Sequence, residues 1–186
     1  KVDAQMLKDA DVDAVILAIG SSPITIKLEG MDKLQHASAP EVLRHEVCPK
    51  GKVAVIGGGL VGLETADTLA TDGCDVTVLE MKDEIGSDLG SLRKIAVMMK
   101  LQQMQVKMLP NSKVCKFTEE GIVLEDETLV PCNCAVFAVG FASNDSHLLV
   151  EECEKRQIPC RVIGDAKSAR RALDAIAEGF EAARTL

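Results

Sequence analysis

One segment constrains the fold of this chain more than any other: a glycine-rich turn between an apolar run and a helix-forming run. The turn has the spacing Gly57-x-Gly59-x-x-Gly62, and a second apolar run ends in Glu80, 23 positions after Gly57. In a nucleotide-binding βαβ unit, the three glycines allow a tight turn, a close approach of pyrophosphate and close packing of helix on strand. An acidic residue about 20 positions further on hydrogen-bonds a ribose 2′-hydroxyl. The segment therefore predicts a dinucleotide site.

The predicted phosphate contacts lie in the turn and the first residues of the helix, because free N–H groups and the positive end of the helix dipole attract anions there. The residues concerned are Gly57, Gly58, Gly59, Leu60, Val61 and Gly62. Glu80 favours NADH over NADPH, since a 2′-phosphate beside its carboxylate would cost about 1–4 kcal/mol. Met81 follows, and no arginine stands beside it to receive a phosphate. Lys82 is either a partial partner for such a phosphate or a solvated loop residue.

Composition narrows the class of protein further. The formal net charge of −8 argues against nucleic acid as a partner, because phosphates attract the opposite charge. No apolar run approaches the ~20 residues of a membrane span, so no membrane partner is expected. The seven cysteines are odd in number and scattered, which favours a reducing cytoplasm over a disulfide framework. Cys132 and Cys134 enter an apolar run, where a structural role is favoured over metal or redox chemistry; no metal ligands are predicted.

Helical periodicity is predicted in three stretches. The first covers residues 60–71 and should end at Gly73, in a left-handed cap. The second lies within residues 86–104, and the third follows Asp165. Their apolar stripes comprise Leu92, Ile95, Ala96 and Met99 in the second, and Leu173, Ile176, Ala177, Phe180 and Ala183 in the third. The Met-rich residues 97–104 are interpreted as core filler rather than as an adaptable binding surface.

Short β-like runs complete the pattern. Runs at 106–109, 114–117 and 122–124 predict an antiparallel meander within an α/β unit. The continuous apolar runs at 13–19 and 135–139 each lead into a glycine and predict buried strands. Between them, Ser38-Ala-Pro-Glu41 fits a capping box that starts a short helix. The first residue, Lys1, is not Met, which suggests a piece of a longer protein.

This layout resembles the two-dinucleotide-binding-domain flavoproteins, in which an NAD(P)H domain is inserted into an FAD domain. Gly20 and Gly140 resemble the glycines that end the family's Ala-Thr-Gly strands, although Ile19 and Val139 replace threonine. Gly164-Asp165 resembles the motif whose carboxylate holds the ribityl chain of FAD. The fold class expected is α/β, a Rossmann-like parallel sheet with an inserted antiparallel meander.

The resemblance also implies a division into domains. Residues 1–28 and 141–186 would be the C-terminal part of a truncated FAD-binding domain. Residues 51–140 would be a complete NAD(P)H-binding domain, and residues 29–50 a connector. The sites implied by the resemblance are Ile19, Gly20, Gly164 and Asp165 for FAD, with Val139 and Gly140 beside the NAD(H) site.

A narrower resemblance is to the old-yellow-enzyme-related NADH:flavin oxidoreductases, which include 2-enoate reductases, 2,4-dienoyl-CoA reductases and trimethylamine dehydrogenase. It is carried by Val42–Arg44, Val55–Ala66, Asp83–Ile85 and Ala175–Ala183. It implies that NADH passes hydride to FAD, and that FMN and a 4Fe-4S cluster lie in barrel domains of the same full-length chain, where an activated C=C bond is reduced. No catalytic residue is expected in this segment. Glu64 is either near the nicotinamide or a first-turn glutamate stabilised by the helix dipole.

Three alternatives stay open at this point. The chain could belong to a flavin-linked disulfide reductase with its reactive cysteines elsewhere, because no Cys-x-x-Cys occurs here. It could belong to an NADH oxidase. It could also be a non-catalytic domain that holds ADP, as in trimethylamine dehydrogenase, since ADP and NADH share the pyrophosphate and adenosine contacts.

Overall fold

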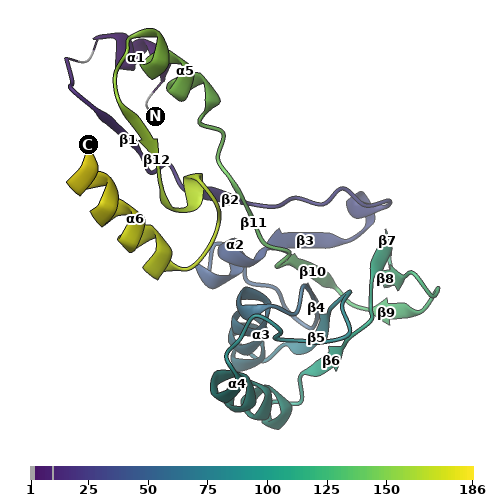
Figure 1. The fold of residues 1–186 in the computed structure, drawn as a ribbon. Helices are drawn as coiled ribbons and strands as arrows, with labels where there is room; N and C mark the ends of the chain where they lie inside the picture. The colour runs from purple at the N-terminus through teal and green to yellow at the C-terminus, as the bar shows by residue number, and fades with distance from the viewer. Residues whose placement is uncertain (1–2, 10) are drawn as a thin grey trace. The chain divides into compact units, whose positions relative to one another are not determined.

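The apolar runs of the central region form a parallel sheet in the computed structural model, which describes residues 3–9 and 11–186 (Figure 1). The sheet has the strand order β3-β10-β4-β5-β6 and lies within residues Pro23–Gly140, here called the inserted unit. Its strands are β3 (Gln35–Ser38), β4 (Lys52–Ile56), β5 (Asp75–Leu79), β6 (Lys107–Leu109) and β10 (Cys134–Phe137). Parallel strands are buried on both faces and need apolar residues at consecutive positions. β10 meets this need, because all four of its residues are buried.

The two faces of the sheet are covered by different elements (Figure 1). The helices α2 (Ala39–Leu43), α3 (Leu60–Thr71) and α4 (Ser91–Gln103) cover one face, and the strands β7 (Val114–Thr118), β8 (Gly121–Leu124) and β9 (Leu129–Pro131) cover the other. Successive side chains of a strand point to opposite faces. Val53 and Val55 of β4 therefore join the cluster under the helices, while Ala54 and Ile56 join the cluster that contains Phe117.

The meander differs by one strand from the predicted one. The run at 106–109 forms β6, which pairs in parallel with β5 at the edge of the sheet. The third strand of the meander is instead β9, which pairs antiparallel with β8. The prediction was wrong here because so short a run carries no signal for its pairing partner. The preceding helix α4 is the crossover that delivers β6 parallel to β5.

Helix α4 packs on the inserted unit with a different stripe from the predicted one. Leu92, Ile95 and Met99 are 86, 58 and 57% exposed. The residues that pack on the core are Val97, Met98, Leu101 and Met104. Apolar residues lie on more than one side of this helix, so periodicity alone could not select the buried side. The predicted core role of the Met-rich stretch is confirmed for Met98 and Met104, which pack against the core.

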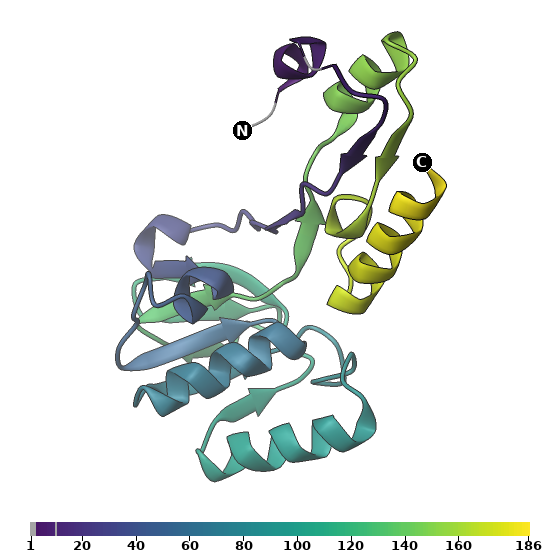
Figure 2. The ribbon, with the colours of Figure 1, turned by 90° about the vertical axis from the view of Figure 1, so that its left-hand side faces the viewer.

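Residues up to Ser22 and Phe141–Leu186 form the second unit, here called the flanking unit. In it, β1 (Val15–Leu17) pairs in parallel with β12 (Cys160–Val162). Its helices are α1 (Ala4–Asp9), α5 (His147–Lys155) and α6 (Ala172–Thr185). The short strand β2 (Ser21–Pro23), which ends on the first residue of the inserted unit, pairs with β11 (Phe141–Ser143). Figure 2 shows α6 running alongside β1 and β12. The apolar stripe predicted on α6 is present but uncovered, since Leu173, Ile176 and Phe180 are 75, 68 and 71% exposed.

The two units divide the chain at positions other than those expected for the domains. Residues 23–28 and the expected connector 29–50 belong to the inserted unit, where the 3-10 turn η1 (Met31–Lys33) precedes β3. β3 pairs in parallel with β10, with Ser38 opposite Phe137. Its sequence Gln-His-Ala-Ser lacks an apolar run, so no strand was expected there. The capping box that follows is confirmed, because the Ser38 N–H donates to Glu41 Oε2 at 2.7 Å and α2 begins at Ala39.

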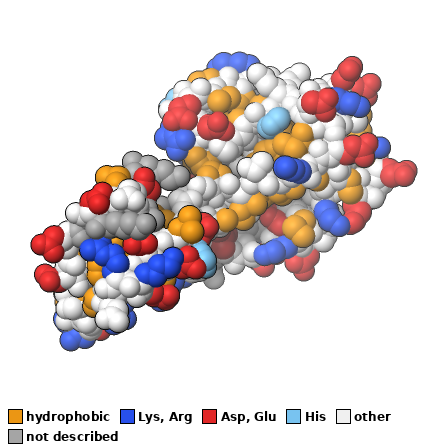
Figure 3. All heavy atoms as spheres, turned by 90° about the horizontal axis from the view of Figure 1, so that it is seen from above, with side chains coloured by type: hydrophobic (Ala, Val, Ile, Leu, Met, Phe, Trp, Pro, Cys, Tyr) orange, Lys and Arg blue, Asp and Glu red, His pale blue; other side chains and the backbone are white. Residues whose placement is uncertain are grey.

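The surface carries charges of both signs, as Figure 3 shows for one face. Many of them are paired across exposed positions, as in the contact of 2.6 Å between Lys113 Nζ and Glu125 Oε1. Exposed pairs of this kind contribute about 0–1 kcal/mol each. Among the residues described, no helix combines the length and the apolar character needed to cross a lipid bilayer.

Candidate nucleotide-binding sites

The glycine turn of the inserted unit joins β4 to α3. Gly57 has φ +111°, a conformation that side chains other than glycine rarely adopt, and its N–H donates to Leu79 O at 2.8 Å. A Cβ built on Gly62 would lie 1.9 Å from Gly57 O, so the first turn of α3 packs against the backbone at a distance that only glycine allows. Gly59 is the N-cap residue of α3. The turn therefore has the geometry that its spacing predicts.

Glu80 lies at the carboxyl end of β5 with its side chain directed to the glycine turn. Its Oε2 accepts a hydrogen bond of 2.7 Å from the Gly58 N–H, and its Oε1 accepts one of 2.9 Å from the Lys82 N–H. The backbone is held on both sides, because the Glu80 N–H donates to Leu109 O and the Ser112 N–H donates to Glu80 O. A carboxylate has about four acceptor positions, so its oxygens retain capacity for a ligand hydroxyl.

A cavity of about 520 Å³ lies beside these two elements, at the carboxyl ends of β4, β5 and β10. Its volume falls in the range of about 300–1,000 Å³ that is usual for ligand pockets. Nine of the predicted site residues line it: Gly57, Gly59, Leu60, Val61, Glu80, Met81, Lys82, Val139 and Gly140. The site is positioned as in other open α/β sheets, where ligands bind outside the carboxyl ends of the strands.

Three further predicted residues of this unit lie outside the lining. Gly58 binds Glu80 through its N–H, and Gly62 packs on Gly57. Glu64 lies on α3 with a side chain that is 48% exposed and forms an ion pair of 2.8 Å with Arg93 Nη2 of α4. Two of these residues thus support the shape of the turn, while Glu64 is engaged with the neighbouring helix.

Sequence reasoning missed several residues that line the cavity. They are Ile26, Leu28, Ile56, Leu79, Asp88, Ser112, Lys113, Val114 and Ala138. Ser112 is 8% exposed and ties the loop after β6 to Glu80. The position of Asp88, eight residues after Glu80 in a polar loop, gave a weak signal, because no motif fixes where such a loop folds. Ile26 and Leu28 lie within residues 1–28, which the resemblance assigns to the FAD-binding domain, so no signal placed them at this site.

In the flanking unit, the Gly164-Asp165 turn lines a cavity of about 400 Å³ together with Gly20. Gly164 has φ +60° and begins the 3-10 turn η2 (Gly164–Ala166). The Asp165 carboxylate accepts hydrogen bonds from Ser21 Oγ at 3.1 Å and from the Arg170 N–H at 3.2 Å. Ile19 is not part of the lining; its carbonyl accepts from Asn144 Nδ2 at 2.8 Å.

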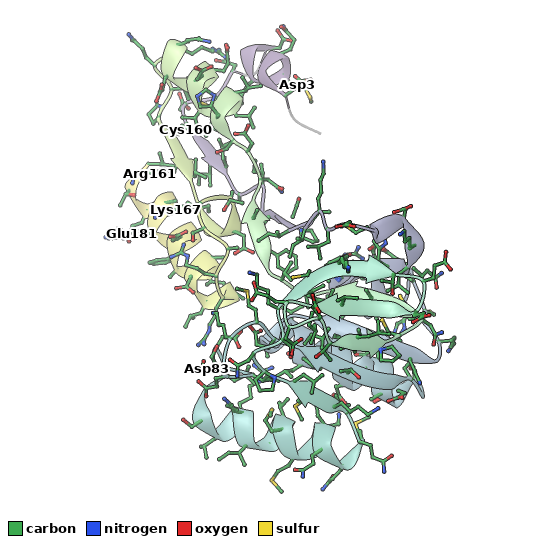
Figure 4. The ribbon with its side chains drawn as sticks, turned by 90° about the vertical axis from the view of Figure 1, so that its right-hand side faces the viewer. Asp3, Asp83, Cys160, Arg161, Lys167 and Glu181 are labelled. Carbon is green, nitrogen blue, oxygen red and sulfur yellow. The ribbon has the colours of Figure 1, made fainter. Side chains whose placement is uncertain are left out.

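Glu178 of α6 holds this turn in place and was not predicted as a site residue. Its Oε2 accepts from the Gly164 N–H at 2.7 Å, and its Oε1 accepts from Arg170 Nη2 at 2.5 Å and from Lys167 Nζ at 3.1 Å. Lys167, labelled in Figure 4, thus contacts α6 at the middle of the helix. The hydrogen bond from Arg170, followed by the one from Gly164, lowers the pKa of the Glu178 carboxyl to about 2.

The cysteines at 132 and 134 are buried in the inserted unit. Burial raises the pKa of each thiol to about 11, which keeps both protonated and unreactive. In the part of the chain that the structure describes, no group of three or more His, Cys, Asp or Glu side chains is placed to hold a metal ion. The favoured structural role of these two cysteines is consistent with their burial, Cys134 in β10 and Cys132 in the link between β9 and β10.

Comparison with known proteins identifies relatives of this chain by sequence. A bilirubin reductase from Mediterraneibacter gnavus is 36% identical over 191 residues, covering 99% of this chain and 29% of that protein. A cinnamate reductase from Clostridium sporogenes is 35% identical over 97% of this chain and 27% of that protein. An NADH oxidase from Thermoanaerobacter brockii is 31% identical over 97% of this chain and 29% of that protein. The chain thus spans less than a third of the length of these curated relatives.

Solved structures share the fold over the whole chain. A 2-naphthoyl-CoA reductase has a TM-score of 0.88 at 23% identity, covering 100% of this chain and 29% of that one. A histamine dehydrogenase from Rhizobium sp. 4-9 has a TM-score of 0.84 at 15% identity, covering 100% and 32%. The family model described as pyridine nucleotide-disulphide oxidoreductase matches residues 2–166. The glycine turn, the Glu80 carboxylate after β5 and the Gly164-Asp165 turn are all in place. The chain belongs to the pyridine nucleotide-disulphide oxidoreductase family, and its α/β fold is that of these flavin- and NAD(P)-binding oxidoreductases.

Proposed function

We propose that this chain is the NADH-binding, electron-entry region of a flavoprotein oxidoreductase. In it, the inserted unit binds NADH and the flanking unit contributes part of an FAD site. The observation that carries the proposal is the 520 Å³ cavity at the carboxyl ends of β4, β5 and β10, bounded by the glycine turn and by the Glu80 carboxylate. The redox chemistry would belong to the bound cofactors, while the protein orients them and excludes water.

The residues around the cavity fit a dinucleotide. The N-terminus of α3 offers backbone N–H groups and the positive end of the helix dipole to a pyrophosphate. Glu80 is held between the Gly58 and Lys82 N–H groups at 2.7 and 2.9 Å, where its remaining acceptor positions suit ribose hydroxyls. Leu28 and Val139 provide apolar contacts for a planar ring. The predicted proximity of Glu64 to a nicotinamide remains part of the proposal and requires Glu64 to exchange its contact with Arg93.

The same carboxylate supports NADH as the preferred nucleotide. A 2′-phosphate about 4 Å from Glu80 would cost roughly 1–4 kcal/mol at effective dielectric constants between 80 and 20. At 1.4 kcal/mol per factor of ten, the penalty is about fivefold to several hundredfold in Kd. Lys82 and Lys113 line the same cavity and would offset part of it, although Lys113 is already paired with Glu125 at 2.6 Å.

For the flavin, the chain supplies the Gly164-Asp165 turn, with Ile19 and Gly20 at the end of the segment after β1. Asp165 would accept hydrogen bonds from ribityl hydroxyls, and Ser21 and the Arg170 N–H orient its carboxylate. Gly164 and Gly20 line the adjoining cavity, where the lack of side chains leaves room for a ligand. Glu178 keeps the turn in position through the Gly164 N–H.

We further propose that the electrons reduce an activated C=C bond at a separate FMN site, reached through a 4Fe-4S cluster, in barrel domains outside this segment. The relatives named for bilirubin and cinnamate, both conjugated unsaturated molecules, support this choice of acceptor. The relative named NADH oxidase leaves oxygen as the competing acceptor. The test is NADH consumption by the full-length protein with cinnamate under anaerobic conditions, followed at 340 nm. Consumption of NADH without oxygen supports the C=C bond as acceptor, and its absence supports oxygen.

Calorimetric titration of the chain with NADH, NADPH and ADP in one buffer tests the binding function. NADH should bind more tightly than NADPH by at least about fivefold, and more tightly than ADP because the nicotinamide half adds contacts. If ADP binds as tightly as NADH, the inserted unit is a nucleotide-holding domain without a role in electron entry. If NADPH binds most tightly, the assignment of Glu80 to the ribose is wrong.

A further inference from the structure

A carboxylate occupies the phosphate-binding end of α3. Both side-chain oxygens of Asp88 accept from the Leu60 N–H, at 3.1 and 3.0 Å. The same carboxylate lies against Gly59, since a Cβ built on that glycine would be 3.2 Å from Asp88 Oδ2. Asp88 also lines the 520 Å³ cavity. The side chain therefore stands at the place where the glycine turn would receive a pyrophosphate.

The loop that carries Asp88 is anchored before and after this residue and exposed at the residue itself. Ile85 is 6% exposed and belongs to the core, and the Gly86 N–H donates to Gly58 O at 2.7 Å. After Asp88, Leu89 packs against the core and its N–H donates to Gly86 O at 3.1 Å. Asp88 is exposed to solvent. Gly90, two residues further on, has open space around the position of a Cβ. Asp88 can therefore leave the helix end by rotation of its exposed side chain, while the anchors at Ile85, Gly86 and Leu89 stay in place.

Two anions cannot share this end of the helix at low cost. The N-terminus of α3 attracts a carboxylate and a phosphate for the same reasons, the orphan N–H groups and the helix dipole. A phosphate that accepts from the Leu60 N–H would lie within a few ångströms of the Asp88 oxygens, and like charges at such distances repel strongly where the dielectric constant is reduced. Occupation by one anion thus disfavours occupation by the other.

On the basis of the proposed function, we propose that Asp88 is an affinity-determining residue that competes with the phosphates of the dinucleotide for the N-terminus of α3. Without nucleotide, its carboxylate caps the helix. Nucleotide binding displaces the carboxylate into solvent, and the loss of this cap weakens the observed affinity. The competition acts on the phosphate part of the ligand only.

The variant Asp88→Asn tests the competition, because the side-chain oxygen of asparagine can accept the same hydrogen bond from the Leu60 N–H but carries no charge. The ligands are NADH, ADP and adenosine, titrated calorimetrically into the wild type and the variant in one buffer at low salt. We expect the variant to bind NADH and ADP about tenfold more tightly, which corresponds to about 1.4 kcal/mol, and to bind adenosine as the wild type does. Thermal unfolding followed by circular dichroism verifies the fold, and Asp88→Ser serves as a second uncharged capping variant.

Asp83→Asn is the matched control. Asp83 is an exposed carboxylate of the same loop, labelled in Figure 4, and is not among the residues that line the cavity. Its variant removes the same charge and should leave all three dissociation constants unchanged. Unchanged or weaker binding of NADH and ADP by Asp88→Asn overturns the inference, as does equal tightening in the control or tightening of adenosine. If the wild type binds NADH and the variant binds it no better, only the inference fails; if neither protein binds any of the nucleotides, the proposed function fails with it.

Discussion

Substitution of Gly62 by alanine should break the contact that sets α3 against the glycine turn. The new Cβ would lie 1.9 Å from Gly57 O and 3.0 Å from Gly57 C, both backbone atoms that no side-chain rotation can move aside. Ordinary contact begins at 3.4 Å, so the helix would have to retreat by roughly 1–1.5 Å from the turn. Overpacking of this kind typically costs about 1–3 kcal/mol. A cost of about 2 kcal/mol would lower the Tm of a chain of this size by roughly 4–8 °C.

Circular dichroism is the suitable assay, because the chain contains no Trp or Tyr to report unfolding by fluorescence. Gly90→Ala is the matched control: Gly90 has φ −65°, and a Cβ there meets no heavy atom within 4 Å. Gly90 is the N-cap residue of α4, where alanine is less favourable than glycine, so the control should lower the Tm slightly and by less than Gly62→Ala does. Equal Tm values for Gly62→Ala and the wild type would refute the claim that this close approach holds the turn. NADH affinity should fall together with the Tm, since the displaced helix would carry the proposed phosphate contacts.

Three further predictions concern charge and reactivity. Glu80→Gln should narrow the preference for NADH over NADPH by removing the repelling charge, measured as the ratio of the two Kd values; an unchanged ratio would contradict the assignment. The folded-state pKa of Glu178, lowered to about 2 from an ordinary 4.5, means that its charge stabilises the fold fully above pH 4.5 and that this stabilisation is lost as the pH falls towards 2. The Tm difference between wild type and Glu178→Gln should therefore be largest above pH 5 and shrink in acid. A Tm difference that does not change with pH would mean that the packing of the Glu178 side chain, and not its charge, stabilises the fold. Thiol titration of the native chain at pH 8 should label Cys48 and Cys115 first, because both are exposed, and the three buried cysteines only after unfolding.

The parts of the fold that were predictable are those in which the local sequence determines the geometry. The glycine spacing placed the turn, α3 spans the predicted residues 60–71, and Gly73 follows it with φ +85° as a left-handed cap. Ser38 and Glu41 formed the predicted capping box, because all of its atoms lie within four residues. Such features need no knowledge of what packs on them.

The parts that were not predictable depend on distant residues. β3 is recognisable only from its pairing with β10, almost 100 residues later, and β6 only from its pairing with β5. Which side of α4 is buried depends on its packing against α3 and the sheet, and the apolar periodicity of α4 alone does not determine it. At the site, Asp88 reaches Leu60 across a loop whose path no spacing rule encodes. Glu178 bonds Gly164 from 14 positions away for the same reason.

The inserted unit enters and leaves at neighbouring points, with consequences for how such a protein can be rearranged. The Ile24 N–H donates to Gly140 O at 3.0 Å, so the two ends of this unit nearly touch. In the flanking unit, the Asn144 N–H donates to Gly20 O at 3.0 Å. The two chain segments between which the inserted unit lies are therefore equally close to each other. The inserted unit is thus a cassette whose removal leaves a gap that a short turn can bridge. Under the proposed function, exchange of such cassettes would change the nucleotide preference and leave the pairing of β1 with β12 in the flanking unit as it is.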